Sequence, residues 1–295
     1  MKQKIRTILI LGGGGFIGRN LVESLSHDVH VVAPTHKELD LLQEHQVTQF
    51  LTRYSFDTII SAATHDATQF SLKDRSTVLS SNLRMFFHLA KNSHLFGRMF
   101  YFGSGAEFNL NHYQPKMNEE YFGTHVPQDD YGLSKYIMNT IAMRSTNIIN
   151  LRLFGVYGPY EDWRIRFISN AICKTLVDHD ITMHQNVFFD YLWINDLVAI
   201  VKRLMSTPRL QHSSYNVCTG QTIDLKSLAS IVKKISGKNI KIISASPGLK
   251  AEYSGDNQRL LSEIGDITFT PHKQAIQSLY EWYDAHRDII NPTLL

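Results

Sequence analysis

Cysteine is scarce in this sequence, with only Cys173 and Cys218 among 295 residues, and the two lie far apart. Such a pair provides neither a disulfide framework nor the closely spaced cysteines of a zinc site, and it is typical of a reduced cytoplasmic protein. The 14 histidines do not cluster at metal-ligand spacing. We therefore expect no bound metal.

Long hydrophobic runs are also missing. The first apolar run, residues 5–11, is followed at once by glycines, and it is too short for a signal peptide or a membrane span. No later run reaches membrane length. We expect a soluble cytoplasmic protein with no membrane partner.

The chain has no strong excess of one charge. Its 30 basic and 27 acidic residues are well mixed and give a net charge of +3, with no basic arm to indicate nucleic-acid binding. A hydrophobic content of 43% is ordinary for a globular enzyme. A length of 295 residues suits one large α/β domain or a domain with a smaller lobe.

The first two-thirds of the chain alternates apolar segments with amphipathic ones. This alternation predicts a doubly wound parallel sheet of the Rossmann type with helices on both faces. We expect strands at residues 5–11, 29–33, 58–62, 98–102 and 148–154, and helices at residues 17–26, 47–54, 76–93 and 131–144.

The pattern loosens after Gly158-Pro159. We expect a dinucleotide-binding domain from residues 1–158 plus about 187–218, and a smaller α/β substrate-binding lobe from residues 159–186 and 219–295. Asp196 is expected to cap the helix that follows it. The later elements that we expect are a strand at 187–192 and helices at 166–178, 196–205, 225–236 and 273–286.

A glycine-rich turn follows the first apolar run. The spacing Gly12-x-x-Gly15-x-x-Gly18 allows a tight turn and a close approach of the backbone to a pyrophosphate, and Phe16 and Ile17 open the next helix. Amide groups at a helix N-terminus favour negative charge. Gly13, Gly15 and Gly18 also fit a G-x-G-x-x-G spacing, so the register stays open, but both registers predict a dinucleotide site.

Tyr131 and Lys135 carry the chemical signal. Reduction of a ketone requires a hydride on carbon and a proton on oxygen, and tyrosine can donate that proton. Residues i and i+4 share a helix face, so the Lys135 ammonium is expected beside the phenol, where it favours the phenolate. Ser104, in a small-residue segment before them, is expected to hold the substrate oxygen.

Together these features resemble the extended short-chain dehydrogenase/reductases of the NAD-dependent epimerase/dehydratase family, which act on nucleotide sugars. The resemblance includes Gly12–Gly18, Ser104 and the Tyr131/Lys135 pair. Further along the chain it is carried by residues 57–63, Asn82, and residues 151–159, 189–197 and 215–220. It is nearest to reductases of 4-keto-6-deoxy sugars, such as GDP-fucose synthase-like enzymes.

The resemblance implies roles for individual residues. Ser104 takes the family's Ser/Thr position, Tyr131 is the acid/base, and Lys135 binds the nicotinamide ribose and lowers the tyrosine pKa. Asp40 is a candidate for contacting the adenine, and Ala62, Ala63 and Asn82 are candidates for lining the cofactor. A homodimer through the helices at 76–93 and 131–144 is also implied.

The cofactor is predicted to be NADP rather than NAD. NAD-binding folds usually place an acidic residue at the end of the second strand, to accept hydrogen bonds from the ribose 2′-hydroxyl. Here Thr35, His36 and Lys37 offer donors that suit a 2′-phosphate instead. These residues also fit an ordinary polar loop, so NAD stays open.

The substrate side departs from the family's commoner patterns. Gly105 and Ala106 stand where dehydratases carry an Asp-Glu pair, which argues against a 4,6-dehydratase and leaves Glu107 as a candidate substrate contact. Gly155 stands where many epimerases have asparagine. Arg164 and Arg166 are candidates for binding a diphosphate through bidentate contacts, or they belong to a solvated helix start.

The leading hypothesis is NADP-dependent reduction of the 4-keto group of a nucleotide-activated 4-keto-6-deoxy sugar, for surface polysaccharide biosynthesis. The alternative enzyme is an NAD-dependent nucleotide-sugar 4-epimerase, which uses the same three catalytic residues. A non-catalytic dinucleotide-sensing protein is a third hypothesis, but such relatives usually lose the tyrosine or the lysine.

Overall fold

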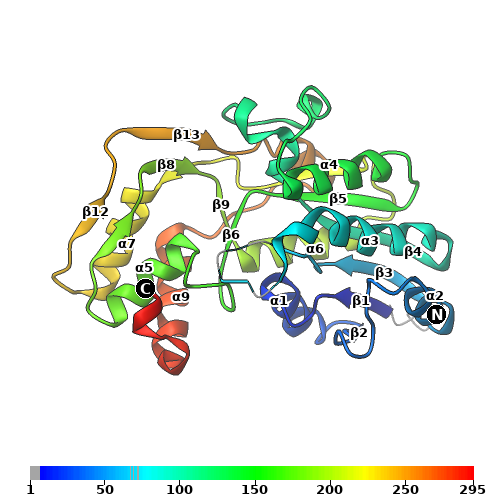
Figure 1. Cartoon of the computed structure of the whole chain (residues 1–295), viewed down its shortest axis with the longest axis horizontal. Coiled ribbons are helices and arrows are strands. Elements are labelled where there is room, and N and C mark those ends of the chain that lie inside the picture. The colour runs from blue at the N-terminus through cyan, green and yellow to red at the C-terminus, as the bar shows by residue number, and fades with distance from the viewer. Residues whose placement is uncertain (1–6, 67, 69, 72) are drawn as a thin grey trace.

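The computed structural model describes residues 7–66, 68, 70–71 and 73–295, and its centre is a six-stranded sheet (Figure 1). Neighbouring strands are all parallel, in the order β10-β5-β4-β3-β1-β2. The predicted doubly wound α/β fold is confirmed; residues 5 and 6 of the first predicted strand lie outside the described residues. The strands are β1 (Thr7–Leu11), β2 (His30–Val32), β3 (Phe56–Ser61), β4 (Phe96–Ser104), β5 (Ile148–Leu153) and β10 (Ser214–Val217).

Both faces of this sheet are buried. On β1, Ile8 and Ile10 belong to one hydrophobic cluster, and Leu9 and Leu11 belong to another on the opposite face. Successive side chains of a strand point to opposite faces, so a strand covered on both sides needs apolar residues at every position. This explains why the first strand reads as a continuous apolar run.

Helices cover the two faces in separate groups. One face packs against α1 (Phe16–Leu25) and α6 (Ile194–Ser206). The other packs against α2 (Glu44–Arg53), α3 (Val78–Lys91) and α4 (Asp130–Ala142). The homodimer that we expect through α3 and α4 stays a prediction.

A second group of elements lies beyond the carboxyl ends of the strands, on the left in Figure 1. It contains a three-stranded sheet, in which β8 lies between β11 and β13, and two two-stranded sheets, β12-β7 and β6-β9. The strands are β6 (Gly155–Tyr157), β7 (Ile181–Met183), β8 (Asn186–Phe189), β9 (Tyr191–Trp193), β11 (Ile223–Asp224), β12 (Ile242–Ser244) and β13 (Leu249–Tyr253). The helices are α5 (Phe167–Leu176), α7 (Leu225–Ser236), α8 (Gln258–Ile264) and α9 (His272–Ala285).

The single strand predicted at residues 187–192 is in fact two strands, β8 and β9. They are separated at Asp190, which has no exposed surface. Its carboxylate accepts hydrogen bonds from Thr219 N at 2.8 Å, Thr219 Oγ1 at 2.7 Å and Gly220 N at 2.7 Å. These bonds fix the chain where it leaves β10, which returns to the six-stranded sheet beside β5. The residue-level division into two lobes stays our proposal.

Asp196 does not cap α6 as expected. Trp193 occupies the N-cap position, and Asp196 lies in the first helical turn. The Asp196 carboxylate accepts hydrogen bonds from Thr270 N at 3.0 Å and Thr270 Oγ1 at 2.8 Å. It therefore connects α6 to the segment that leads into α9.

The glycine turn between β1 and α1 is closely packed. Gly12 has a φ of +79°, which favours glycine, and its carbonyl accepts a hydrogen bond from Gly15 N at 3.0 Å. A Cβ added at Gly18 would lie 2.1 Å from that carbonyl oxygen, whereas a Cβ at Gly14 meets nothing within 4 Å.

This contrast makes a matched pair of stability predictions. Gly18→Ala is expected to lower the free energy of unfolding by about 1–3 kcal/mol, because the new methyl group overlaps backbone. Gly14→Ala is expected to change it by less than about 0.5 kcal/mol. Urea unfolding followed by circular dichroism measures both, and equal losses in the two variants would contradict the packing described.

Candidate active site

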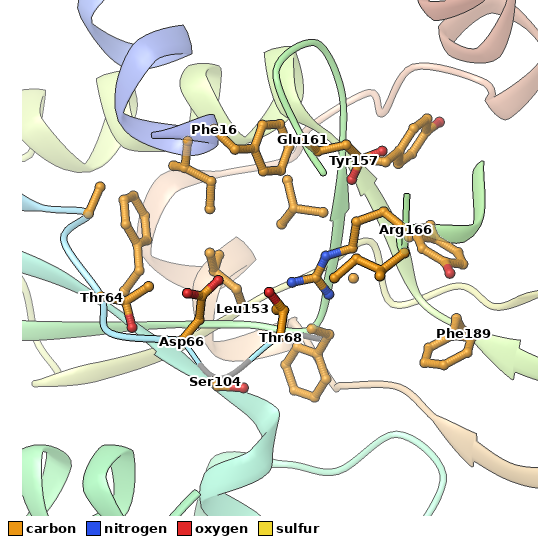
Figure 2. Close-up of a pocket in the computed structure, with 18 of the residues that line it drawn as sticks. Phe16, Thr64, Asp66, Thr68, Ser104, Leu153, Tyr157, Glu161, Arg166 and Phe189 are labelled. Carbon is orange, nitrogen blue, oxygen red and sulfur yellow. The ribbon is translucent and has the colours of Figure 1, made fainter. Parts of the chain in front are cut away.

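A cavity of about 700 Å³ opens at the carboxyl ends of the strands (Figure 2). Its walls come from the start of α1, the end of β3, the end of β4, the first turns of α4 and the second group of elements. The chain order reverses between β1 and β3, and ligands of open parallel sheets bind at such a switch point. The residues that matter here are Phe16, Ile17, Ala62, Ala63, Ser104, Tyr131, Lys135, Glu161, Arg166, Tyr191 and Tyr253.

The glycine turn fits a pyrophosphate. Gly15 is the N-cap of α1 and provides no side-chain cap, and the first turn has no acidic residue, so the amide groups there are free to bind an anion. A Cβ on Gly12 would lie 2.7 Å from the Ala63 nitrogen. Only glycine therefore lets the turn lie against residues 62 and 63, which line the same cavity.

Ser104 is the last residue of β4 and begins a short 3₁₀ turn, Gly105–Phe108. Its hydroxyl oxygen accepts a hydrogen bond from Ala106 N at 3.2 Å. This bond fixes the side chain while the hydroxyl proton stays available for donation. Ser104 lines the cavity.

Tyr131 and Lys135 lie one turn apart on α4, which Asp129 caps by accepting a hydrogen bond from Gly132 N at 2.7 Å. The Lys135 Nζ atom lies 5.6 Å from the centre of the Tyr131 ring. Lys135 is 4% exposed, and its ammonium donates to the Phe102 carbonyl at 2.9 Å. Tyr131, Lys135 and Ser104 thus line one cavity, and their catalytic roles stay a prediction.

Burial controls the protonation of this pair. It lowers the pKa of Lys135 to about 8, partly offset by the negative charge of Glu107. It also raises the pKa of the Tyr131 phenol, although a hydrogen bond from Ser104 and the charge of Arg166 oppose that rise. In the protein alone, Tyr131 is therefore protonated at neutral pH and can act as a proton donor.

The predicted adenine end lies around the end of β2, and Thr35, His36, Lys37 and Asp40 do not line the cavity. Residues 31–37 include no carboxylate, but the side chain of Glu38 folds back onto Thr35. Thr35 donates to Glu38 Oε2 from its backbone nitrogen at 2.7 Å and from its hydroxyl at 2.8 Å. A carboxylate and the Lys37 ammonium therefore both lie at this end of the predicted site.

Asp40 and Asn82 hold backbone in place. The Asp40 carboxylate accepts from Leu42 N at 2.9 Å. Asn82 is buried, accepts from His65 N at 2.8 Å and donates to His65 O at 2.9 Å. Asn82 does not line the cavity. It positions the segment that follows β3, and Thr64 of that segment lines the cavity.

The expected substrate contact of Glu107 does not fit the geometry. Glu107 has no exposed surface and is absent from the cavity wall. Its carboxylate is bound to Arg152 Nε at 2.9 Å and to the Asn150 side-chain amide at 3.0 Å. The residue lies behind Ser104, on the side away from the substrate space.

The two candidate arginines differ. Arg164 forms a bidentate pair with Asp162 at 2.7 and 2.8 Å and packs on the Phe70 ring, and it does not line the cavity. Figure 2 shows the Arg166 guanidinium projecting into the cavity, toward Thr68 and Asp66. Among the described residues no ion pair of Arg166 is seen. Arg166 is thus the arginine left for a ligand.

Glu161 and Tyr253 are among the cavity residues that were not predicted from the sequence. Glu161 is 5% exposed and accepts a hydrogen bond from the Ser169 hydroxyl, and burial raises the pKa of its carboxyl to about 8. In the sequence it resembles an ordinary charge near a helix start. Tyr253 comes from β13, and a Cβ at Gly105 would lie 2.5 Å from its hydroxyl oxygen. No local signal connects residues 105 and 253.

Within the described part of the chain, no group of three or more His, Cys, Asp or Glu residues could hold a metal ion. Cys173 and Cys218 are both buried and unpaired with each other. No helix in the same part of the chain has the length and apolarity needed to cross a membrane.

Two known proteins that are similar in sequence to this chain are named as enzymes of nucleotide sugars. The sequence is 25% identical to a GDP-6-deoxy-D-talose 4-dehydrogenase of Aggregatibacter actinomycetemcomitans, over 93% of this chain and 97% of that protein. It is 22% identical to an ADP-L-glycero-D-manno-heptose-6-epimerase of Brachyspira hyodysenteriae, over 87% of this chain and 90% of the relative.

The fold agrees with solved structures. A GDP-mannoheptose C4 reductase from Campylobacter jejuni, solved with NADP bound, superposes with a TM-score of 0.83 at 18% identity, over 96% of this chain and 100% of the other. The family model described as NAD dependent epimerase/dehydratase family matches residues 8–218, which is more than half of the chain. The protein therefore belongs to the NAD-dependent epimerase/dehydratase family.

Proposed function

We propose that this protein catalyses the NADP-dependent reduction of the 4-keto group of a nucleotide-activated 4-keto-6-deoxy sugar, as a step toward a surface polysaccharide. The observation that carries the proposal is the set of Ser104, Tyr131 and Lys135 on the wall of one cavity, beside a glycine turn suited to a pyrophosphate. The names of the relatives, a 4-dehydrogenase and a C4 reductase, support chemistry at C4 of the sugar.

Ser104, Tyr131 and Lys135 have different roles in protonating the carbonyl oxygen. The glycine turn at Gly12, Gly15 and Gly18 would hold the pyrophosphate of a nicotinamide dinucleotide, which would supply a hydride to the carbonyl carbon. The Ser104 hydroxyl holds the oxygen, and Tyr131 transfers its phenolic proton to that oxygen as negative charge develops there. Lys135 then stabilises the phenolate that remains, because the ammonium and the ring lie on one face of α4. A proton from solvent restores the phenol for the next turnover.

Arg166 is proposed as the contact for the substrate diphosphate. Its guanidinium enters the cavity opposite the wall that carries Ser104, and a guanidinium can bind two phosphate oxygens at once. Aromatic rings from Phe189, Tyr191 and Tyr253 line the same part of the cavity and offer flat surfaces for a sugar or a base.

An NAD-dependent 4-epimerase is the second candidate, and one observation favours it. The Glu38 carboxylate lies against Thr35, at the end of β2 where NAD-binding proteins usually present an acid to the ribose. An epimerase would use the same three catalytic residues and would keep its dinucleotide between oxidation and reduction.

The reductase proposal predicts NADPH oxidation, followed by absorbance, with at least one nucleotide 4-keto-6-deoxy sugar. Tyr131→Phe should lower kcat by about 10²-fold or more, because the proton donor is lost. Tyr136→Phe on the same helix is the matched control, since Tyr136 stacks on Phe122 and does not line the cavity. Interconversion of intact nucleotide sugars without net cofactor use would instead establish the epimerase.

The cofactor assignment predicts different effects for substitutions at two neighbouring residues. If NADPH is the donor, Lys37→Ala should raise the KM for NADPH about tenfold and leave the KM for NADH unchanged, because only NADPH has the 2′-phosphate. Glu38→Gln should raise neither the KM for NADPH nor the KM for NADH. A loss of NADH binding in Glu38→Gln, with NADPH not used by the wild type, would support NAD. Steady-state kinetics with both donors measures these constants.

The diphosphate assignment predicts a difference between the two arginines. Arg166→Gln should raise the KM for the nucleotide sugar by about 10–100-fold, as expected for loss of a charge-assisted hydrogen bond, with a smaller effect on kcat. Arg164→Gln should change KM much less, because that side chain is already paired with Asp162. Similar KM values in the two variants would remove Arg166 from the proposed substrate site.

A further inference from the structure

A buried polar network lies directly behind Ser104. Its members Glu107, Asn150, Arg152 and Asn216 have no exposed surface. Arg152 donates from Nε to Glu107 at 2.9 Å and from Nη1 to the Asn216 side-chain oxygen at 2.9 Å. The network thus extends from the end of β4 through β5 to β10, beneath the floor of the cavity.

Glu107 contacts the catalytic segment itself. Its Oε1 atom accepts a hydrogen bond from Ser104 N at 3.1 Å, while the Ser104 hydroxyl accepts from Ala106 N at 3.2 Å. The two bonds form a capping box around the 3₁₀ turn. A Cβ at Gly103 would lie 2.2 Å from the same Glu107 oxygen, so the carboxylate also lies against the backbone between Phe102 and Ser104.

Lys135 binds the same short stretch of backbone. Its ammonium donates to the carbonyl of Phe102, only two residues before Ser104. The helix that carries it is packed tightly against the 3₁₀ turn, since a Cβ at Gly132 would lie 2.9 Å from the Ala106 carbonyl oxygen. The carboxylate and the ammonium therefore act on one piece of chain within a water-excluded region.

We propose that Glu107 is a positioning residue of the active site, whose buried carboxylate fixes the Ser104 backbone and supplies negative charge behind Lys135. This inference is independent of which nucleotide sugar is used, and only its kinetic test rests on the proposed function. It assigns to Glu107 a role different from the substrate contact expected from the sequence.

The negative charge of Glu107 determines the direction in which it shifts the pKa of neighbouring groups. The Glu107 charge raises the pKa of Lys135 against the lowering by burial, and it raises the pKa of Tyr131, Tyr101 and Tyr253 as well. Arg152 is the cation paired with it. Removing the negative charge of Glu107 should therefore lower the pKa of Lys135. The ammonium beside Tyr131 would then be lost at a lower pH than in the wild type.

The test is a pH titration of Lys135 in the protein without cofactor. Lysine labelled with ¹³C at Cε is incorporated, and the Lys135 signal is assigned by its disappearance in Lys135→Arg. In the wild type we expect a midpoint near pH 8. Glu107→Gln should move the midpoint to lower pH. Glu161→Gln removes a different buried carboxyl, one that lines the cavity, and should leave the Lys135 midpoint unchanged. An unchanged midpoint in folded Glu107→Gln overturns the proposal.

Two further variants keep the test decisive if Glu107→Gln is unstable, since it leaves Arg152 buried without an anion. The double variant E107Q/R152M removes both charges and should melt at a higher temperature than E107Q, with a Lys135 midpoint still below that of the wild type. Glu107→Asp keeps the charge and should keep the midpoint near that of the wild type. A low midpoint in Glu107→Asp would contradict the role of charge.

Kinetics provides a second readout that a merely structural residue would not change. In Glu107→Gln the alkaline limb of kcat/KM should move to lower pH, and each pH unit of displacement lowers kcat/KM about tenfold above the limb. A purely structural role would lower kcat/KM at every pH and leave the limb in place, which overturns the electrostatic part. If the proposed reduction fails altogether, the NMR titration still decides the role of Glu107.

Discussion

The carboxyl end of β4 is the place on which the rest of the site depends. Within three residues, the Phe102 carbonyl binds Lys135, Gly103 leaves room for buried oxygens, and the Ser104 amide binds Glu107. A one-residue slip in the pairing register of β4 would turn its side chains, including that of Ser104, to the opposite face of the sheet. The positions of Ser104 and Lys135, to which we assign catalytic roles, are thus set by the same stretch of backbone.

Buried charge is the main energetic demand of this arrangement. Lys135 and Arg152 are both cations shielded from water, and each is held by hydrogen bonds to fixed oxygens. Desolvation of a charge is costly unless it is paired and hydrogen-bonded, so the Glu107–Arg152 pair is not a simple source of stability. In the proposed mechanism, the role of this pair is to hold a fixed electric field beside Tyr131, which would transfer the proton.

Much of the sheet, and the pairing of Tyr131 with Lys135 on one helix face, could be predicted because the sequence patterns that indicate them are local. Apolar runs mark strands that are buried on both faces, glycines mark the turn that touches the Ala62–Ala63 backbone, and the spacing of four between Tyr131 and Lys135 places them on one helix face. Each of these features is fixed by residues that are near one another in the sequence.

The remainder depends on contacts between distant segments. The residues next to Glu107 in the sequence do not indicate that Arg152 and Asn150 bind its carboxylate. In the same way, the residues next to Asp190 do not indicate that a strand ends there and that the carboxylate binds Thr219 and Gly220. The short strands β7 and β12 have three residues each and exist because they pair with each other across 60 residues of chain. Such elements have no periodicity long enough to be read locally.

The two walls of the cavity therefore have different origins and different tasks. The wall from β4 and α4 carries the proton-transfer groups, which a reductase and an epimerase need equally. The facing wall brings Glu161 and Arg166 from one short segment after β6, together with Tyr253 from β13. Because both proposed reactions use the same groups of the first wall, we expect the second wall to select the sugar. We expect the dinucleotide to be selected at the end of β2, where Lys37 and Glu38 are adjacent residues of opposite charge.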